Sequence, residues 1–315
     1  MSLKISFVIP CYRSEKTVGS VIAEIISTMD PSEYDYEIIA VNDCSPDDVW
    51  RVLKDLSTCN KKIKAINLSK NMGKSSARMA GFNNATGDYI VSLDDDGQCP
   101  VDRIFDLIKP LSEGFDASIA KYPKKKQSAF KNFGSWVNSV MTRVMINKPK
   151  DLQVSNFSVV KKFVIDEIVK YDHPFPYFSG LLLRTTTKVT NVEMEERARI
   201  SGKSTFTFAK LITLWMNGLT AFSVKPLRLA TMIGTAYALL GFIFGLYTII
   251  YKIINPNVAK GYSSTISIIM FTCGIMMLML GLIGEYIGRI YICINKSPQY
   301  VIKESANIEK DKKEE

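Results

Sequence analysis

The chain has 315 residues, of which 47% are hydrophobic, and a formal net charge of +9 at pH 7. This length allows one large domain or two ordinary ones, and the basic balance suits contact with anionic lipid. One histidine and six scattered cysteines without a CxxC pair argue against a zinc site, a multi-histidine metal site and a Cys/His nucleophile. The thiols fit a reducing compartment.

Strands and helices alternate over the first 120 residues. Short apolar runs predict strands at residues 5–9, 36–41, 63–68, 89–93 and 117–120. The stretches between them predict helices at 17–29, 75–84 and 101–112, and one that Ser45 or Asp47 caps and that runs to Leu56. This order predicts an α/β domain with a parallel, doubly wound sheet.

Polar residues follow each of the first four predicted strands. They are Pro10-Cys11-Tyr12, Asn42-Asp43, residues 69–74 and the triplet Asp94-Asp95-Asp96. Open α/β sheets bind ligands in the crevice outside the carboxyl ends of their strands. The sequence therefore predicts that these four loops converge on one binding site.

The acidic triplet indicates a cation. Neighbouring carboxylates raise one another's pKa unless positive charge compensates them. Mg²⁺ or Mn²⁺ bridging these acids to a substrate diphosphate would do so, because both ions prefer hard oxygen ligands. A solvated acidic turn is the alternative for the tripeptide alone.

Two uncharged stretches, 229–251 and 263–284, are 23 and 22 residues long. Each matches the roughly 20 residues that cross a bilayer, although buried helices of a soluble core are the alternative. Pro256 and Gly261 lie between the two stretches and predict a helical hairpin. Two crossings return the chain to the side on which it entered.

Flanking charges give the expected orientation of this hairpin. The outer ends carry Lys225, Arg228, Arg289 and Lys296, against Lys252 and Lys260 in the loop. No apolar signal segment precedes Ile5, so residues 1–226 are expected in the cytoplasm.

Three further segments have distinctive compositions. Residues 117–150 hold seven Lys, one Arg and no acid, interleaved with Phe130, Phe133 and Trp136. Beside a membrane hairpin this favours anionic lipid over nucleic acid, with a solvated surface helix as the alternative. Residues 206–222 predict an interfacial amphipathic helix or a core helix, and the charged residues 303–315 predict a disordered tail.

These loops resemble a known family. VIPCY at 8–12, VNDCS at 41–45, NMGK at 71–74 and DDDGQ at 94–98 resemble the inverting GT-A glycosyltransferases of family 2. The hairpin and GEYIGR at 284–289 narrow the resemblance to the polyprenyl-phosphate glycosyltransferases, which include dolichyl-phosphate mannose synthase and GtrB-like and ArnC-like bacterial enzymes. The resemblance covers residues 4–301. It implies a GT-A domain at 1–205, an interfacial helix and linker at 206–226, two spans within 227–290 (about 229–251 and 263–287), and a cytoplasmic tail at 291–315.

The resemblance also implies roles for individual residues. Asp43 would accept a hydrogen bond from a ring N–H of the nucleobase, and Pro10 and Tyr12 would form part of the base pocket. Lys74, Asp94 and Asp95 would bind other parts of the nucleotide-sugar. Asp94, Asp96 and Gln98 would hold Mg²⁺ or Mn²⁺. Asp96, Arg199 and Asp151 would be catalytic. Arg199 and Ser204, which lie in a segment similar to the family's R-x-x-G-x-S, would contact the acceptor phosphate with Lys124 and Lys125.

Several positions depart from the family pattern. Asn42 and Cys44 replace the more usual Asp and Gly on either side of Asp43. Asp95 stands where many relatives carry a small residue. Lys121 and residues 124–126 stand where relatives often have Arg. Lysine can replace arginine as a point charge for phosphate, but it loses the bidentate geometry. Residues 151–157 correspond to the family's acidic loop.

The implied reaction transfers one sugar, with inversion, from a nucleotide to undecaprenyl phosphate at the bacterial inner membrane. The resemblance to bacterial relatives with this hairpin implies UDP rather than GDP as the nucleotide of the donor. It also implies that the protein can be a tetramer, as family members of this two-span type can be. A phosphate monoester has its second pKa near ~6, so the acceptor is already ionised and cations need only position it. A processive polysaccharide synthase is an alternative, weakened by the missing Q-x-x-R-W segment and by two spans. A non-catalytic membrane scaffold is another.

Overall fold

The computed structural model describes residues 3–123, 149, 151–198, 225–255, 261–295 and 297–308. The chain divides into two compact units, one made of residues 1–211 and 296–315 and the other of residues 212–295. The first unit contains β1 (Lys4–Cys11), α1 (Val18–Met29), β2 (Asp35–Asn42), α2 (Val49–Cys59), β3 (Ile63–Leu68), α3 (Lys74–Asn83), β4 (Tyr89–Ser92), the 3₁₀ turn η1 (Val101–Arg103), α4 (Ile104–Ser112), β5 (Ala117–Lys121), β6 (Ser158–Lys161), α6 (Lys162–Ile168), α7 (Phe178–Thr185), β7 (Val189–Glu193) and β8 (Ile302–Ala306).

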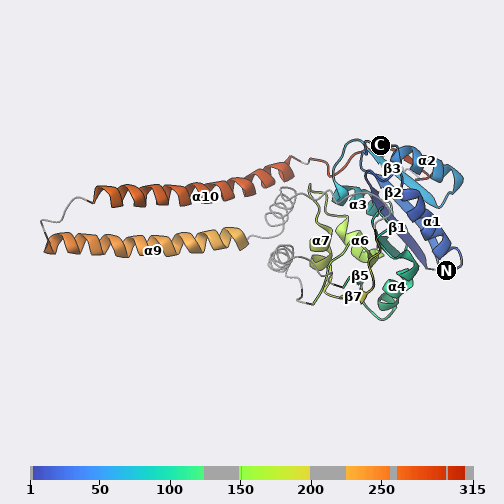
Figure 1. Cartoon of the computed structure of the whole chain (residues 1–315), viewed down its shortest axis with the longest axis horizontal. Coiled ribbons are helices and arrows are strands. Elements are labelled where there is room, and N and C mark those ends of the chain that lie inside the picture. The colour runs from blue at the N-terminus through green and yellow to red at the C-terminus, as the bar shows by residue number, and fades with distance from the viewer. Residues whose placement is uncertain are drawn as a thin grey trace. The chain divides into compact units, whose positions relative to one another are not determined.

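In the described residues of this unit, one mixed sheet has eight strands in the order β7-β5-β6-β4-β1-β2-β3-β8. Its central strands β1, β2 and β3 lie side by side in Figure 1. The strands β4, β1, β2 and β3 are mutually parallel, as the sequence predicts. The expectation of a fully parallel sheet is wrong at β6, which is antiparallel to β4 and β5, and at β8, which is antiparallel to β3. Both strands reach the sheet after long excursions of the chain, which local hydrophobic patterns do not reveal.

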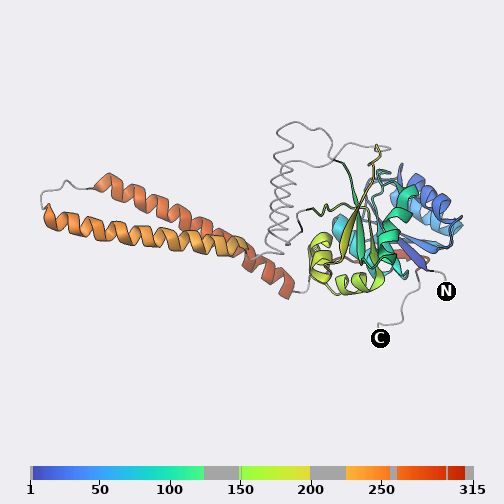
Figure 2. The ribbon, with the colours of Figure 1, turned by 90° about the horizontal axis from the view of Figure 1, so that it is seen from below.

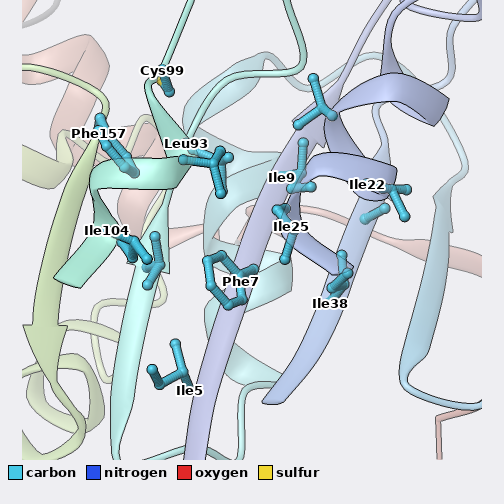
Figure 3. Packing of buried hydrophobic residues seen from close by; sticks show 14 of the residues in the cluster. Ile5, Phe7, Ile9, Ile22, Ile25, Ile38, Leu93, Cys99, Ile104 and Phe157 are labelled. Carbon is cyan, nitrogen blue, oxygen red and sulfur yellow. The ribbon is translucent and has the colours of Figure 1, made fainter. Parts of the chain in front are cut away.

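The main core lies between one face of the sheet and α1, α2 and α4. Figure 3 shows Phe7 and Ile9 of β1 beside Ile25 of α1, and Ile5 and Ile22 belong to the same buried cluster. All five side chains are almost fully buried. Burying one large apolar side chain contributes about 1.5–3 kcal/mol, so this cluster fixes the central strands firmly.

The opposite face of the sheet is covered by α3, with α7 packed against it. A Cβ at Gly81 would lie 2.3 Å from Val8 Cγ1, so α3 rests closely on β1. The rings of Phe82 and Phe178 pack 5.3 Å apart, and α6 and α7 lie side by side in both views (Figures 1 and 2). This packing fixes the N-terminus of α3, where Lys74 begins the helix.

A buried carboxylate ties together the amino ends of the strands. Glu37 pairs with Lys64 Nζ at 2.8 Å and Lys4 Nζ at 3.1 Å. It also accepts hydrogen bonds from Ser6 Oγ and from the N–H and Oγ1 of Thr86. Burial alone would raise the pKa of Glu37, but these partners lower it to about 2.

We expect Glu37→Ala to destabilise the protein by about 3 kcal/mol, because it leaves buried donors and cations without their acceptor. Thermal unfolding of the full-length protein in detergent measures this, with exposed Glu33→Ala as the matched control. Since the folded pKa of about 2 lies below the ordinary 4.5, the contribution is fully present above about pH 4.5. It is lost as the pH falls through about 2. A variant as stable as the control would contradict this account.

Residues 302–306, after the hairpin, form the strand β8, so the predicted disordered tail of residues 303–315 is wrong for its first residues. β8 pairs with β3, and Val301 O accepts the N–H of Ser69 at 2.9 Å. Gln299 Nε2 donates to the carbonyls of Tyr171 and His173, and Asn307 Nδ2 donates to that of Ile63. Edge strands are often charged, so composition alone mistakes this one for a tail. Residues 309–315 lie outside the described residues.

The second unit contains two long helices, α9 (Lys225–Ile254) and α10 (Tyr262–Ile294). The hydroxyls of Tyr237 and Thr272 lie 3.1 Å apart, and the ring of Tyr237 packs on Phe271. Residues 230–247 and 271–294 are long and apolar enough to cross a membrane. The predicted interfacial segment 206–226 lies outside the described residues up to residue 224.

Candidate active site

The loops after β1, β2, β3 and β4 meet at one edge of the sheet. The Tyr12 N–H donates to Asp95 Oδ2 at 3.0 Å, which joins the loops after β1 and β4. The Met72 N–H donates to Asp43 Oδ1 at 2.8 Å, which joins the loops after β2 and β3. Lys74 forms an ion pair with Asp94. The predicted convergence of the four loops is confirmed.

Asp43 is a buried carboxylate at the end of β2, only 2% exposed. It accepts hydrogen bonds from the backbone N–H groups of Met72 and Gly73. Burial raises its pKa above the ordinary value, although the two N–H donors partly oppose this. The next residue, Cys44, has a φ of 48°, in the left-handed region that favours glycine. Pro10, the other predicted base-pocket residue beside Tyr12, is buried in β1 opposite Val41.

The three carboxylates of the triplet have different partners. Asp94 pairs with Lys74 and accepts a hydrogen bond from Asn156 Nδ2 at 3.0 Å. Asp95 Oδ2 accepts the backbone N–H of Tyr12. Asp96 Oδ1 accepts the N–H of Gln98 at 3.2 Å, across a turn in which Gly97 adopts a φ of 73°.

These partners separate the electrostatic environments of Asp94 and Asp95. Burial alone would raise the pKa of Asp94, but Lys74, together with Arg78 and Asn156, brings it below the ordinary value. Burial raises the pKa of Asp95, and its hydrogen bond from Tyr12 opposes this only in part. Asp94 is therefore the more firmly ionised of the two.

Arg78 and Asn156 belong to this site but are not among the site residues predicted from the sequence. Arg78 is 6% exposed, and its Nη2 donates to Asn156 Oδ1 at 3.1 Å. Its guanidinium lies over the Phe178 ring, 5.2 Å from the centroid. Arg78 stands four residues after Lys74 in α3, a spacing that places both on one helix face and could have suggested it.

We expect Asn156→Leu to lower stability by about 2 kcal/mol and to reduce turnover about tenfold, because Arg78 loses its acceptor and Asp94 loses its donor. Thermal unfolding and steady-state rates measure the two effects. Asn84→Leu is the matched control, because Asn84 donates to the carbonyl of Ala80 within α3. Equal activities of the two variants would show that Asn156 does not support the site.

The Gln98 loop is held by a second segment. Gln98 Nε2 donates to Glu196 Oε1 and to the Arg197 carbonyl, both at 3.2 Å. Arg197 in turn pairs with Glu24 of α1 and with Asp102 of η1, each at 2.6 Å. The residues just before the predicted catalytic Arg199 thus brace the loop that carries Asp96.

Some predicted site residues fall in segments that the structure does not describe. Arg199, Ser204, Lys124 and Lys125 lie outside the described residues. Lys121 pairs with Glu193 at 2.6 Å. Asp151 is exposed, and its catalytic role stays a prediction; the residue of segment 151–157 that contacts Asp94 is Asn156.

The side-chain oxygens of Asp94, Asp96 and Gln98 are of the kind that Mg²⁺ and Mn²⁺ prefer as ligands. Asp94 already carries the positive charge of Lys74 as its partner, and Asp96 lies half-buried two residues away. Within the described ranges, however, no three His, Cys, Asp or Glu side chains form a ready metal site. An ion held by Asp94, Asp96 and Gln98 would therefore assemble its ligands on binding.

The fold is shared with solved nucleotide-sugar enzymes. Glucosyl-3-phosphoglycerate synthase from Mycobacterium tuberculosis, in complex with Mn²⁺, UDP and phosphoglyceric acid, matches with a TM-score of 0.52 and 19% identity, over 69% of this chain and 76% of that one. The architecture is that of the GT-A class of α/β glycosyltransferases.

Sequence comparison gives the family. The model of glycosyl transferase family 2 matches residues 6–170, and that of the GtrB C-terminal hairpin matches residues 225–290. The prophage bactoprenol glucosyl transferase homolog of Escherichia coli (strain K12) is 32% identical over 96% of this chain and 99% of its own length. The undecaprenyl-phosphate 4-deoxy-4-formamido-L-arabinose transferase of Proteus mirabilis (strain HI4320) is 30% identical over 98% and 96%. The chain belongs to glycosyl transferase family 2 and carries a GtrB-type hairpin.

Proposed function

We propose that this glycosyltransferase moves a single sugar, with inversion, from a nucleotide-sugar to undecaprenyl phosphate or a similar polyprenyl phosphate. One observation carries the proposal: a family 2 domain and a GtrB-type hairpin occur together over nearly the full length of relatives named for transfer to bactoprenol and undecaprenyl phosphate. UDP is the proposed nucleotide and Mg²⁺ or Mn²⁺ the proposed cofactor.

The buried Asp43 is the proposed reader of the base. Its carboxylate already accepts two backbone N–H groups, and an N–H of a pyrimidine ring supplies a further donor of the same kind. A site that hydrogen-bonds one polar edge of a ligand strongly rejects ligands without that edge. Tyr12, 42% exposed in the neighbouring loop, offers an aromatic wall.

The diphosphate is proposed to lie at the N-terminus of α3. The first backbone N–H groups of a helix and its dipole favour anions, and α3 is ten residues long. Lys74 adds an ammonium group at this end. A divalent ion held by Asp94, Asp96 and Gln98 would stabilise the negative charge that develops on the departing diphosphate.

The acceptor needs positioning more than activation. A phosphate oxygen attacks the anomeric carbon from the face opposite the diphosphate, so one C–O bond forms as the other breaks and the configuration inverts. Because the phosphate is already ionised at neutral pH, no general base is required. Arg199, Ser204, Lys124 and Lys125 are the proposed contacts to this phosphate.

The position of β8 supports a membrane topology with both flanks of the hairpin on one side. β3 precedes the hairpin and β8 follows it, yet the two strands pair in one sheet. If α9 and α10 cross a membrane, residues before and after them must therefore share a compartment. We propose the cytoplasmic side of a bacterial inner membrane, where nucleotide-sugars are available.

The donor is identified by incubating membranes that contain the protein with undecaprenyl phosphate, Mg²⁺ or Mn²⁺ and a panel of UDP- and GDP-sugars. Mass spectrometry of the extracted lipid should show one new product with one donor, and EDTA should abolish it. A product that grows by repeated increments would favour a polysaccharide synthase instead. Absence of any product across the panel would contradict the proposal.

A further inference from the structure

A chain of hydrogen bonds leads from the last strand to the loop that carries Asp43. Asn67 Nδ2 donates to Glu304 Oε1 at 3.0 Å, and Asn42 Nδ2 donates to Asn67 Oδ1 at 2.8 Å. The Ser45 N–H then donates to Asn42 Oδ1 at 3.0 Å. We call Asn42, Asn67 and Glu304 the amide relay. It connects β8, β3 and β2 in that order.

The carboxylate of Glu304 sets the direction of the relay. An ionised carboxylate only accepts hydrogen bonds, so Asn67 must turn its NH₂ group toward Glu304 and its oxygen toward Asn42. Asn42 must then turn its own NH₂ group toward Asn67, which leaves its oxygen for Ser45. Asn42 and Asn67 are 3% and 7% exposed, so water does not readily replace a lost partner.

The pairing of β8 with β3 is built to align this relay. Leu68 lies opposite Ile302 and Asn67 opposite Glu304, so a bulge at Lys303 shifts the register by one residue. The pair Asn67 and Glu304 continues the regular register of Ala65 with Ala306, so the two side chains lie directly opposite each other, and the shift comes only after them.

The relay ends where two of the site loops are joined. Ser45 Oγ accepts the Arg13 N–H at 2.7 Å, which links the loop after β2 to the loop that carries Tyr12. Between Asp43 and Ser45 lies Cys44, whose left-handed backbone needs support from its surroundings. Fixing the Ser45 amide therefore restrains the backbone turn next to Asp43.

We propose that Glu304 is a positioning residue of the donor site: through Asn67 and Asn42 it holds the Asp43 loop in the form that binds the nucleobase. The strand that follows the hairpin is thus part of the nucleotide site. This inference rests on the proposed function for the role of Asp43. It also gives a reason for Asn42, where the family more often has Asp, because an acid at position 42 could not donate to Asn67.

Reversing the polarity of the relay tests this proposal. Asn42→Asp forces Asn67 to donate toward position 42 and to face Glu304 with its oxygen, so we expect the KM for the nucleotide-sugar to rise about tenfold. Glu304→Gln keeps an accepting oxygen but replaces a charged acceptor by a neutral one, so we expect a smaller rise in KM, of about threefold. In the double variant the amide at position 304 donates to Asn67, which donates to the acid at position 42. The double variant should therefore recover most of the lost affinity, with kcat changing less than twofold throughout.

Asn307→Ala is the matched control. It removes hydrogen bonds between the same tail and the carbonyls of Ser57 and Ile63, outside the relay. We expect a lower unfolding temperature and an unchanged KM. If Asn307→Ala raised KM as much as Asn42→Asp does, the tail would act only through stability and the proposal would fail. Failure of the double variant to recover its affinity for the nucleotide-sugar would also overturn the proposal.

Hydrogen–deuterium exchange of residues 42–48 in nucleotide-free, full-length protein separates this inference from the proposed function. Exchange should be faster in Asn42→Asp than in wild type, and restored in the double variant. If this exchange pattern appears but the wild-type protein turns over no nucleotide-sugar, the positioning role of the relay stands and the proposed function fails. If exchange is the same in all variants, the relay does not position the loop.

Discussion

Replacing Asp96 by alanine is expected to lower kcat for sugar transfer about 10³-fold while the protein stays folded. Removing one group that stabilises developing charge typically costs 10²–10³-fold, and loss of a metal ligand at the leaving diphosphate adds to this. Asp96 is half-buried in the turn after β4, so its loss should cost less than about 1 kcal/mol of stability. Rates of lipid-linked product formation, measured beside thermal unfolding, test both parts.

Two variants make this test specific. Asp106→Ala removes an acid that pairs with Arg103 on the surface of α4, and it should keep wild-type activity. Asp94→Ala should lose both activity and stability, because it leaves Lys74 and Asn156 without their acceptor. Wild-type turnover by Asp96→Ala would remove Asp96 from the reaction.

Asp43→Asn should raise the KM for the nucleotide-sugar about 10²-fold with a smaller effect on kcat. The amide keeps the size of the side chain, but its NH₂ group would confront the N–H donors that the carboxylate now accepts. Hydrogen bonds to a charged group contribute about 1.5–3 kcal/mol, which corresponds to this range. Exposed Asp48→Asn is the matched control. A change in kcat alone would argue against a role in binding the base.

The raised pKa of Asp43 predicts the sign of a pH effect. Binding through an accepting carboxylate requires the ionised form, so affinity should fall as the pH drops through a pKa above the ordinary Asp value. Calorimetric titration with UDP at a series of pH values measures this. Asp43→Asn should show no such inflection, and an identical one in both proteins would assign it to another group.

The central strands and their loops could be predicted because their signals are local. The predicted strand at 63–68 coincides with β3, and the predicted apolar runs at 5–9 and 36–41 fall within β1 and β2. Polar residues directly after these runs then had to share one edge of a parallel sheet. The pairing of Asp95 with Tyr12 and of Asp43 with Met72 follows from that geometry.

The rest depends on partners far away in the sequence. β8 is a charged strand whose structure comes from pairing with β3, more than 230 residues earlier, as the separation of 237 between Asn67 and Glu304 shows. Asn156 resembles any loop amide until the fold brings it between Arg78 and Asp94. The short β6 inserts antiparallel between β4 and β5, an arrangement that alternation of strands and helices does not foresee.

The most direct test of the account uses the purified full-length protein in lipid nanodiscs with undecaprenyl phosphate, Mn²⁺ and the donor identified from membranes. Mass spectrometry should find a lipid phosphate that carries one sugar, formed by the wild type and reduced about 10³-fold with Asp96→Ala. Equal product with both proteins, or donor consumption without a glycosylated lipid, would contradict a polyprenyl-phosphate glycosyltransferase whose chemistry depends on this acidic loop.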